Sequence, residues 1–313
     1  MRACACSSIE VVNGILIINK PAGITSHDVV SRVRRILQTK RVGHTGTLDP
    51  FATGVMVILV GQATRLAQFL DKDEKEYEAL VRFGFETDTG DVTGLRIAEC
   101  GVRSEEVSTM LASTDWNKIL AGFRGEIEQL PPMYSAKKIA GKKLYEHARK
   151  GETIEREKIN VVIHKLELAD KFQISNLKSE IRIRVECSAG TYIRTLAEDI
   201  GRKIGTGAHL AELCRARAGK FTIGQSLTLE QLEVLDEPQK KLVAMNEAIS
   251  HLPIFTLPDD RVEKTKNGLS TRIAESDFKN NDAVQMHDNI GNLLAVGFYN
   301  DLEKSIQPKV VLV

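Results

Sequence analysis

The apolar positions near the start of the chain predict a strand followed by a helix. The run Gly14–Ile18 is apolar at nearly every position, which is typical of a short buried strand. Residues 20–26 (K-P-A-G-I-T-S) are turn formers, and Ser26 is suited to cap a helix. Apolar residues then recur at helical spacing and predict one buried helical face: Val29, Val30, Val33, Ile36 and Leu37.

A stretch without periodicity follows this helix. Residues 41–53 are rich in glycine, threonine and proline, so we expect a loop there. Residues 54–61 (G-V-M-V-I-L-V-G) predict a fully buried strand. Asp49 is therefore expected in a loop beside a rigid part of the core.

Two later stretches alternate between apolar and other side chains, which indicates strands. The first, Tyr77–Phe85, leads into residues 87–94, a segment dense in turn formers. The second, Ile181–Cys187, leads into a helix, and Arg194 falls off the apolar stripe of this helix, in its first turn. The stripe itself consists of Ile193, Leu196, Ala197, Ile200 and Ile204.

The remaining segments predict an insertion and a second domain. Residues 129–152 contain Pro131, Pro132 and Gly141 with little amphipathic signal, so we expect an exposed insertion. The prolines at 253 and 258 bracket a predicted linker, and residues 261–313 have the short alternating segments of a small all-β module. A chain of 313 residues exceeds the usual size of one domain, so we place a large domain at 1–250 and a small one at 251–313.

The net charge is only +1, but basic residues are concentrated in two segments. Residues 20–41 hold six against one acid, and residues 137–150 again hold six against one. Such clusters suit the neutralisation of phosphates, although most charge runs are only solvated surface. The basic residues of the two segments are Lys20, Arg32, Arg34, Arg35, Lys40 and Arg41, and Lys137, Lys138, Lys142, Lys143, Arg149 and Lys150.

Cysteine usage and the absence of targeting patterns favour a reduced, cytoplasmic setting. The five cysteines are widely separated apart from Cys4 and Cys6, and they show neither a disulfide framework nor zinc spacing. No apolar run resembles a signal peptide or a membrane span. No phosphate-binding glycine motif is present. The acidic turn from Asp88 does not fit a calcium loop, because Gly90, Val92 and Thr93 stand at its third, fifth and sixth places.

Four residues are candidate catalytic-site residues, and each could instead have an ordinary structural role. Asp49 precedes a proline, where aspartate is most often a turn residue. Tyr77 could be a core-facing aromatic, and Tyr192 a packing residue at a turn. Arg194 could pair with Glu198 one helical turn later.

The combination and order of six segments favour the catalytic interpretation of these residues over the structural one. Together they resemble the bacterial TruB family of tRNA pseudouridine synthases over residues 14–225, while the tail from about residue 253 resembles a PUA-type RNA-binding domain. The segments are 14–26 (G-I-L-I-I-N-K-P-A-G-I-T-S), 43–54 (G-H-T-G-T-L-D-P-F-A-T-G), 75–94 (K-E-Y-E-A-L-V-R-F-G-F-E-T-D-T-G-D-V-T-G), 131–151 (P-P-M-Y-S-A-K-K-I-A-G-K-K-L-Y-E-H-A-R-K-G), 187–201 (C-S-A-G-T-Y-I-R-T-L-A-E-D-I-G) and 207–221 (G-A-H-L-A-E-L-C-R-A-R-A-G-K-F).

The resemblance implies a fold and an activity. The fold is α+β, with a mixed, largely antiparallel central sheet, flanking helices and a small β-rich C-terminal domain. The activity is the conversion of uridine 55 in the T-arm of tRNA to pseudouridine, by a cytoplasmic monomer that needs no cofactor, metal, protein partner or guide RNA. Asp49 matches the catalytic aspartate and would attack either C1′ of the ribose or C6 of the base; the sequence leaves both routes open.

The resemblance also assigns the neighbours of Asp49. Arg194 matches the arginine that would hold Asp49 charged and oriented, which agrees with the bidentate geometry of guanidinium and carboxylate. Tyr77 matches the tyrosine that stacks on the flipped uracil and could accept a proton from C5. Tyr192 matches a supporting tyrosine, and Leu213 the apolar wall under the base.

Further matches concern RNA binding and support of the site. His44 matches the histidine that stacks where the evicted base had been, and Lys20 matches a structural motif. In the insertion, Lys142 and Lys143 would contact phosphates. Arg65 stands where many relatives have a lysine for phosphate contact. Two other functions stay open: a non-catalytic RNA binder, and a guide-RNA-dependent synthase of the archaeal and eukaryotic type.

Overall fold

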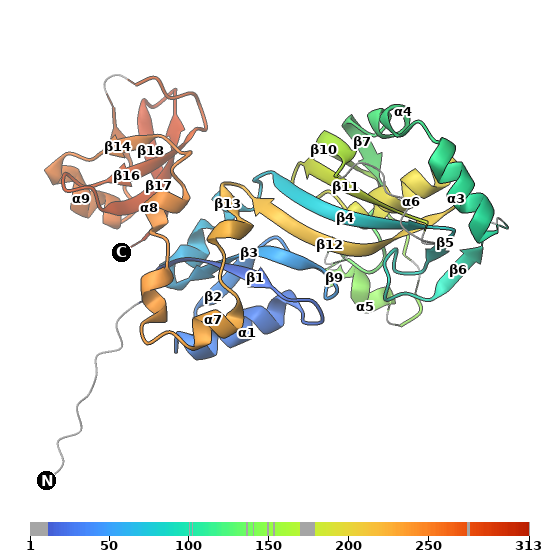
Figure 1. The fold of residues 1–313 in the computed structure, drawn as a ribbon. Helices are drawn as coiled ribbons and strands as arrows, with labels where there is room; N and C mark the ends of the chain where they lie inside the picture. The colour runs from blue at the N-terminus through green and yellow to red at the C-terminus, as the bar shows by residue number, and fades with distance from the viewer. Residues whose placement is uncertain are drawn as a thin grey trace, which may run out of the picture.

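The computed structural model describes residues 12–312, apart from 100, 102, 136, 140, 149, 153, 170–178 and 274–275. A nine-stranded sheet runs through the molecule, and a five-stranded sheet lies at one end (Figure 1). The pairs in the large sheet are antiparallel except for β3 with β12, so the expected fold class is confirmed. Its strands in spatial order are β1 (Gly14–Lys20), β3 (Thr53–Val60), β12 (Ala208–Ala218), β4 (Lys75–Phe83), β11 (Glu180–Cys187), β10 (Ile159–Leu168) and β7 (Gly125–Gln129), with β2 (Val42–Thr45) beside β3 and β13 (Phe221–Thr222) beside β12.

Helices cover different parts of this sheet. α6 (Ile193–Ile204), α3 (Ser104–Ser113) and α4 (Trp116–Ala121) share a core with β4, β10 and β11. α1 (Ser26–Ile36) and α7 (Leu229–Glu233) pack on one face of β1 and β3. The shorter helical segments are η1 (Gly61–Leu66), α2 (Ala67–Leu70), η2 (Ile223–Gln225), η3 (Pro238–Lys241) and α8 (Met245–Ala248). No helix among the described residues is both long and apolar enough to cross a membrane.

The cap of α1 is Thr25, so the prediction that Ser26 caps this helix is wrong. The Thr25 hydroxyl accepts a hydrogen bond from the Asp28 N–H at 3.1 Å, and the Asp28 carboxylate accepts one from the Thr25 N–H at 2.8 Å. This reciprocal arrangement satisfies two backbone donors with a single threonine and aspartate. Ser26 is left free to turn inward, where its hydroxyl bonds to the backbone of Leu48.

Two predicted boundaries along the sheet need correction. The predicted loop 41–53 contains β2, which pairs with β3 from Val42 opposite Val60 to Thr45 opposite Val57. The strand predicted to run to Phe85 stops at Phe83, because Gly84 adopts a φ of +111°. The chain then forms a separate two-stranded sheet from β5 (Phe85–Thr87) and β6 (Arg96–Glu99).

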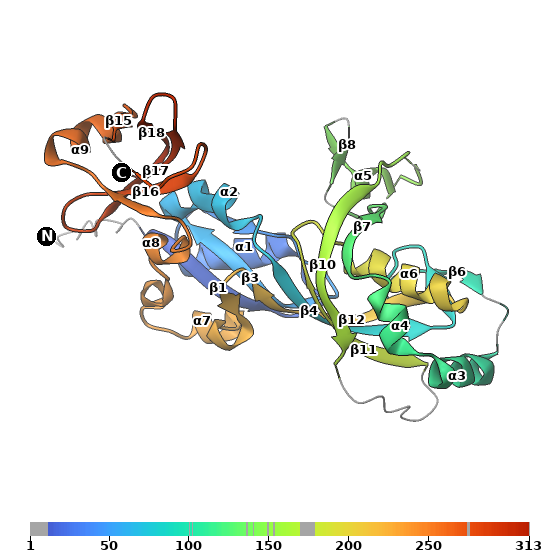
Figure 2. The same cartoon turned by 90° about the horizontal axis from the view of Figure 1, so that it is seen from above.

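The insertion 129–152 carries a small hairpin and one helix. β8 (Lys138–Ile139) pairs with β9 (Lys142–Lys143), and α5 (Leu144–Ala148) follows. Figure 2 shows β8 and α5 standing out at the edge of the molecule beyond β7 and β10. Leu144 is fully buried, so the insertion is anchored by its helix and is not exposed throughout.

The C-terminal domain is β-rich but not all-β. Its strands in spatial order are β14 (Ile254–Thr256), β16 (Ala283–His287), β17 (Leu293–Asn300), β18 (Ser305–Val311) and β15 (Thr271–Arg272). The predicted linker at 253–258 holds β14, which pairs in parallel with β16. The predicted all-β module contains α9 (Asp259–Lys266), which has acids in its first turn and lysines in its last. Val296, Val310 and Leu312 join a core under β1 and β3, so the two sheets pack together.

Candidate active site

The loop that carries Asp49 is held from behind by a buried lysine. The ammonium of Lys20 donates hydrogen bonds to the carbonyls of Pro21 at 2.9 Å, Pro50 at 3.1 Å and Ala52 at 2.7 Å. Burial lowers the pKa of Lys20 to about 8, and the nearby Asp49 carboxylate opposes this shift. Lys20 therefore lies behind the loop, a position consistent with the expectation that it supports the site structurally.

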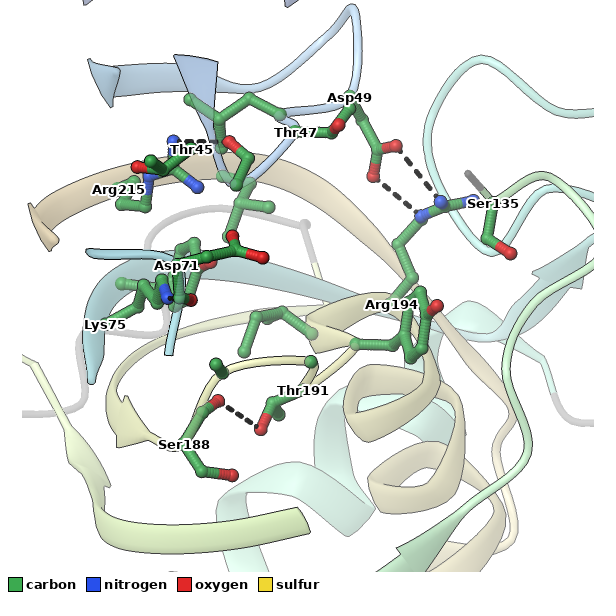
Figure 3. Close-up of a pocket in the computed structure, with 18 of the residues that line it drawn as sticks. Thr45, Thr47, Asp49, Asp71, Lys75, Ser135, Ser188, Thr191, Arg194 and Arg215 are labelled. Atoms are coloured by element: carbon green, nitrogen blue, oxygen red, sulfur yellow. Dashed lines mark hydrogen bonds and ion pairs between the residues drawn. The ribbon is translucent and has the colours of Figure 1, made fainter. Parts of the chain in front are cut away.

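Asp49 faces Arg194 in a two-point ion pair. The Arg194 Nε lies 2.9 Å from Asp49 Oδ2, and Nη2 lies 3.1 Å from Oδ1 (Figure 3). The side chain of Arg194 is 5% exposed and that of Asp49 is 30% exposed, so the carboxylate faces the cavity while the guanidinium lies behind it. Parallel N–H···O bonds of this kind fix the orientation of a carboxylate as well as its charge.

The other donors of Arg194 are also engaged. Nη1 donates to the carbonyl of Thr89 at 2.8 Å, and Nη2 donates to that of Tyr134 at 2.7 Å. Asp91 Oδ2 lies 3.9 Å from Nη1. Arg194 is thus buried by chain segments far away in sequence. The expectation that it lies off the buried stripe is wrong, and so is the plainer alternative of a surface pair with Glu198.

A cavity of about 500 Å³ opens in front of this pair. That volume is within the range of small-ligand sites, which is roughly 300–1,000 Å³. The cavity brings together residues from β2, β4, α6, β12 and the Asp49 loop (Figure 3). Six of the predicted site residues line it: His44, Asp49, Tyr77, Tyr192, Arg194 and Leu213.

Burial dominates the electrostatics of the site. It raises the pKa of Asp49 above its usual range, and the charge and hydrogen bonds of Arg194 oppose this. Burial likewise raises the pKa of Tyr77, and Arg215 opposes it. Burial also raises the pKa of Tyr192, whose backbone N–H and carbonyl are both bound by the side chain of Gln129. A carboxylate in such a place depends on its arginine to stay ionised.

Arg65 and Lys142, two of the predicted RNA-binding residues, lie outside this cavity. Arg65, in η1, donates to the carbonyl of Val311 and so contacts the C-terminal domain. Lys142, in β9, is exposed at the edge of the molecule. The backbone of Lys143 is in β9, but its side chain lies outside the described residues. Among the basic residues of the insertion whose side chains the structure describes, Lys137 lines the cavity.

Sequence reasoning missed several residues around the cavity. Lys75 lies two positions before Tyr77 in β4, and Arg215 lies two positions after Leu213 in β12, so alternation along each strand could have placed both on the pocket face. Asp91 is hidden in a turn-rich segment that gives no periodic signal. Among the described residues, no group of three or more histidine, cysteine, aspartate or glutamate side chains is placed to hold a metal ion.

Comparisons with known proteins agree with this geometry. The family model described as TruB family pseudouridylate synthase (N terminal domain) matches residues 34–193, which is half of the chain. The model described as tRNA pseudouridylate synthase B C-terminal domain matches residues 194–249. The chain belongs to the TruB family of pseudouridylate synthases. It is therefore an isomerase.

Relatives within the TruB family cover nearly the whole chain. A protein of Bacillus licheniformis named tRNA pseudouridine synthase B is 40% identical over 96% of this chain and 98% of its own length. Proteins with the same name in Bacillus subtilis and Staphylococcus aureus are 38% and 41% identical over 96% of the chain, and the matches cover 98% and 99% of their lengths.

Solved structures extend the likeness to the fold. A Cbf5-Nop10-Gar1 complex contains a chain that is 26% identical, with a TM-score of 0.71 over 97% of this chain and 86% of that one. A chain in an H/ACA RNP bound to a substrate RNA is 24% identical, with a TM-score of 0.70 and the same coverage, and this likeness concerns the fold alone.

Proposed function

We propose that this chain converts uridine 55 in the T-arm of tRNA to pseudouridine. The observation that carries the proposal is the two-point pair of Asp49 with Arg194 at the wall of a cavity. The relatives' name, tRNA pseudouridine synthase B, supports the substrate. The pair supplies an oriented carboxylate, and the cavity supplies room for one nucleoside.

The target uridine must leave the RNA stack to reach Asp49. Extruding a base costs about a few kcal/mol, which contacts elsewhere on the RNA must offset. His44 lies in β2 at the cavity wall, where it could stack in the space that the base vacates. The T-arm would then lie across the opening between the Asp49 loop and the insertion.

Asp49 acts as the nucleophile on the extruded nucleoside. Its carboxylate attacks either C1′ of the ribose, which releases the base, or C6 of the ring. Arg194 keeps the carboxylate ionised and aims both of its oxygens. Leu213 and the ring of Tyr77 provide apolar surfaces for the base, because both line the cavity and are largely buried.

Reattachment through C5 leaves a hydrogen on that carbon, and this hydrogen must be removed. We assign the removal of this hydrogen to the phenol group of Tyr77. Tyr77 belongs to β4 and lines the same cavity as Asp49, and Arg215 of β12 lies opposite it in the strand register. Tyr192 supports the start of α6 and so the position of Arg194.

The insertion and the C-terminal domain are proposed to hold the RNA. Lys142 is exposed, and Lys143 adjoins it in β9, which suits contacts with phosphates. In the other basic segment, Arg32 and Arg35 are already paired with Glu230 and Glu233 of α7. We expect the RNA-binding domain of the PUA type to span residues 251–313, with Arg65 at its contact with the rest of the chain.

The enzyme is proposed to act in the cytoplasm, as a monomer on bare tRNA, with neither a guide RNA nor a protein partner. A specific observation favours one rival: the similar solved structures are chains of Cbf5 and H/ACA RNP complexes. A guide-dependent enzyme would leave a bare transcript unmodified. A mere RNA binder would shift the transcript in a binding assay without modifying it.

The test is to incubate the purified chain with an unmodified tRNA transcript and to map pseudouridine along it. We expect one pseudouridine, at position 55, and none in a matched transcript with cytidine there. Binding without modification over a long incubation would exclude the proposed activity. Modification only after a guide RNA and partner proteins are added would favour the rival.

A further inference from the structure

Arg215 is a fully buried arginine in the wall of the active-site cavity. Its exposed fraction is 1%, and its Nε donates to the carbonyl of Val55 at 2.7 Å. Its Nη2 donates to the carbonyl of Gly46 at 3.0 Å, in the loop that carries Asp49. Gly46 adopts a φ of +67°, and a Cβ there would lie 3.2 Å from Arg215 Nη1, so glycine permits this close approach.

The remaining described contact of Arg215 is with Tyr77. The two residues lie directly opposite each other in the antiparallel pair of β12 and β4, and both side chains line the cavity. Burial raises the pKa of Tyr77, while the positive charge of Arg215 opposes this shift. The electrostatic influence of Cys187 and Asp49 raises the pKa of Tyr77 as burial does.

No ion pair among the described residues gives Arg215 a carboxylate partner. Arg217, two positions later, contrasts with it: a register shift places Arg217 opposite Glu76, and it pairs with Glu76 and Glu186. A guanidinium keeps its charge inside proteins, and a buried charge without a counterion is unfavourable. Lys20 and Lys75 add further positive potential beside Arg215. This corner of the cavity is therefore prepared for an anion that forms during the reaction.

We propose that Arg215 is a positioning residue that stabilises the phenolate of Tyr77 and so allows Tyr77 to take the proton from C5. The inference rests on the proposed function. A neutral phenol cannot accept a proton on its oxygen under these conditions, so Tyr77 must first release its own proton to solvent. The adjacent guanidinium makes that charge state attainable in a buried place.

The proton transfer balances without any further reagent. Once C5 is bonded to C1′, C5 carries both a hydrogen and the sugar carbon, and the ring has a double bond between C6 and N1. The phenolate takes the hydrogen from C5 as a proton, and the C–H electron pair forms the C5–C6 double bond. The C6–N1 pair returns to N1, which takes a proton from water. Tyr77 ends as a phenol and returns its proton to solvent.

The test compares single-turnover rates on T-arm RNA that carries either hydrogen or deuterium at C5 of uridine 55. Arg215→Met keeps the unbranched apolar stem of the side chain and removes the charged guanidinium. We expect it to slow the reaction by roughly 100-fold and to raise the C5 deuterium isotope effect roughly twofold or more, since C5–H cleavage becomes slower than the earlier steps. Arg215→Lys should lie between Arg215→Met and the wild type, because it restores the charge.

Arg217→Met is the matched control and should leave both the rate and the isotope effect unchanged. If Arg215→Met does not fold, Arg215→Gln replaces it: this variant keeps donors for the main-chain carbonyls but lacks the charge, and the same rise in isotope effect is expected. A slow variant with an unchanged isotope effect would mean that Arg215 only supports the Asp49 loop, and would overturn the inference. A wild-type chain that forms no pseudouridine would instead overturn the proposed function.

Discussion

The two faces of the large sheet carry the same kinds of charged residue in different surroundings. On the outer face of β4 and its neighbours, Glu76 and Glu78 pair with Arg184 and Arg217, whose side chains are 38% and 24% exposed. On the face covered by α6, Arg194 is 5% exposed and holds Asp49. Strand β4 contributes side chains to both faces of the sheet, because successive side chains along a strand point to opposite faces.

The contrast shows that exposed and buried ion pairs on this sheet contribute differently to stability and to the site. Partly exposed pairs contribute about 0–1 kcal/mol each, because water screens them and long side chains lose freedom. A buried pair is different, because removing one partner leaves a charge without compensation, at a cost of about 3–5 kcal/mol. The outer pairs make the sheet surface compatible with water, while we propose that the inner pair prepares the Asp49 carboxylate for reaction.

The sharpest way to break the comparison is to remove one arginine from each face. Arg194→Met should lower the single-turnover rate by about 10³-fold or more, because Asp49 loses the cation that keeps it ionised and oriented. Arg217→Met should change the free energy of unfolding by less than about 1 kcal/mol and leave the rate nearly unchanged. Rapid-quench kinetics and chemical denaturation measure both quantities. Equal effects from the two variants would contradict the distinction between the faces.

The next largest effect is expected for Tyr77→Phe. This change keeps an apolar ring in the cavity wall and removes only the hydroxyl, which we propose takes the proton from C5. The rate should fall by about 10²–10³-fold, as is usual for a lost acid–base group, while the affinity for T-arm RNA changes less than about threefold. A variant as fast as the wild type would exclude any proton transfer by Tyr77.

Glu198 tests whether burial near Arg194 has an effect on stability. Burial raises its pKa from an ordinary 4.5 to about 7. The folded chain therefore holds more protons than the unfolded chain between these pH values, so this group's stabilising contribution is present below pH 4.5 and is lost as the pH rises through 7.

Glu198→Gln should remove that dependence. The variant should be more stable than the wild type at pH 8 by about 1–2 kcal/mol, a figure reduced for the loss of the contact with Arg202. The advantage should disappear by about pH 4.5. Thermal unfolding of both proteins from pH 4 to 8 measures the difference. A constant difference across this range would show that Glu198 is an ordinary ionised carboxylate.

The smallest effect separates the two basic segments. Replacing Lys142 and Lys143 by alanine should reduce the slope of log affinity against log salt by about one to two, because each lysine would release about one counterion. Replacing Arg32 and Arg35 by alanine should change the slope less, since these side chains are paired with Glu230 and Glu233. Titrations of each variant with T-arm RNA at several salt concentrations measure these slopes. Equal slopes for the two double variants would place the lysines away from the RNA.

Local pattern was enough to predict much of the fold. The strands at Gly14 and Ile181 and the helix from Ile193 follow from periodicity, because their apolar residues face one continuous core. β2 was not predictable in this way, because its four residues owe their strand conformation to pairing with β3. α9 has no apolar stripe, and charges at its two ends favour it instead.

The positions of some site residues could be predicted from the sequence pattern. Their chemical roles could be predicted only from the resemblance to the family. Pattern alone placed Arg194 off the buried face, because helical periodicity cannot register contacts with Thr89 and Tyr134, which are distant in sequence. Arg215 was missed because a basic residue in an alternating strand is typical of a solvated face. Its burial depends on a register that brings β12 against β4 and β3, and no local rule contains that information.

The most direct test of the account is the single substitution Asp49→Asn, measured for both catalysis and binding on the same T-arm RNA. The amide is nearly the same size, so it leaves the loop contacts of Lys20 in place while it removes the negative charge. We predict a loss of pseudouridine formation of about 10⁴-fold or more, with a dissociation constant within about threefold of the wild type. Pseudouridine formed by Asp49→Asn at a rate close to that of the wild type would contradict the central claim.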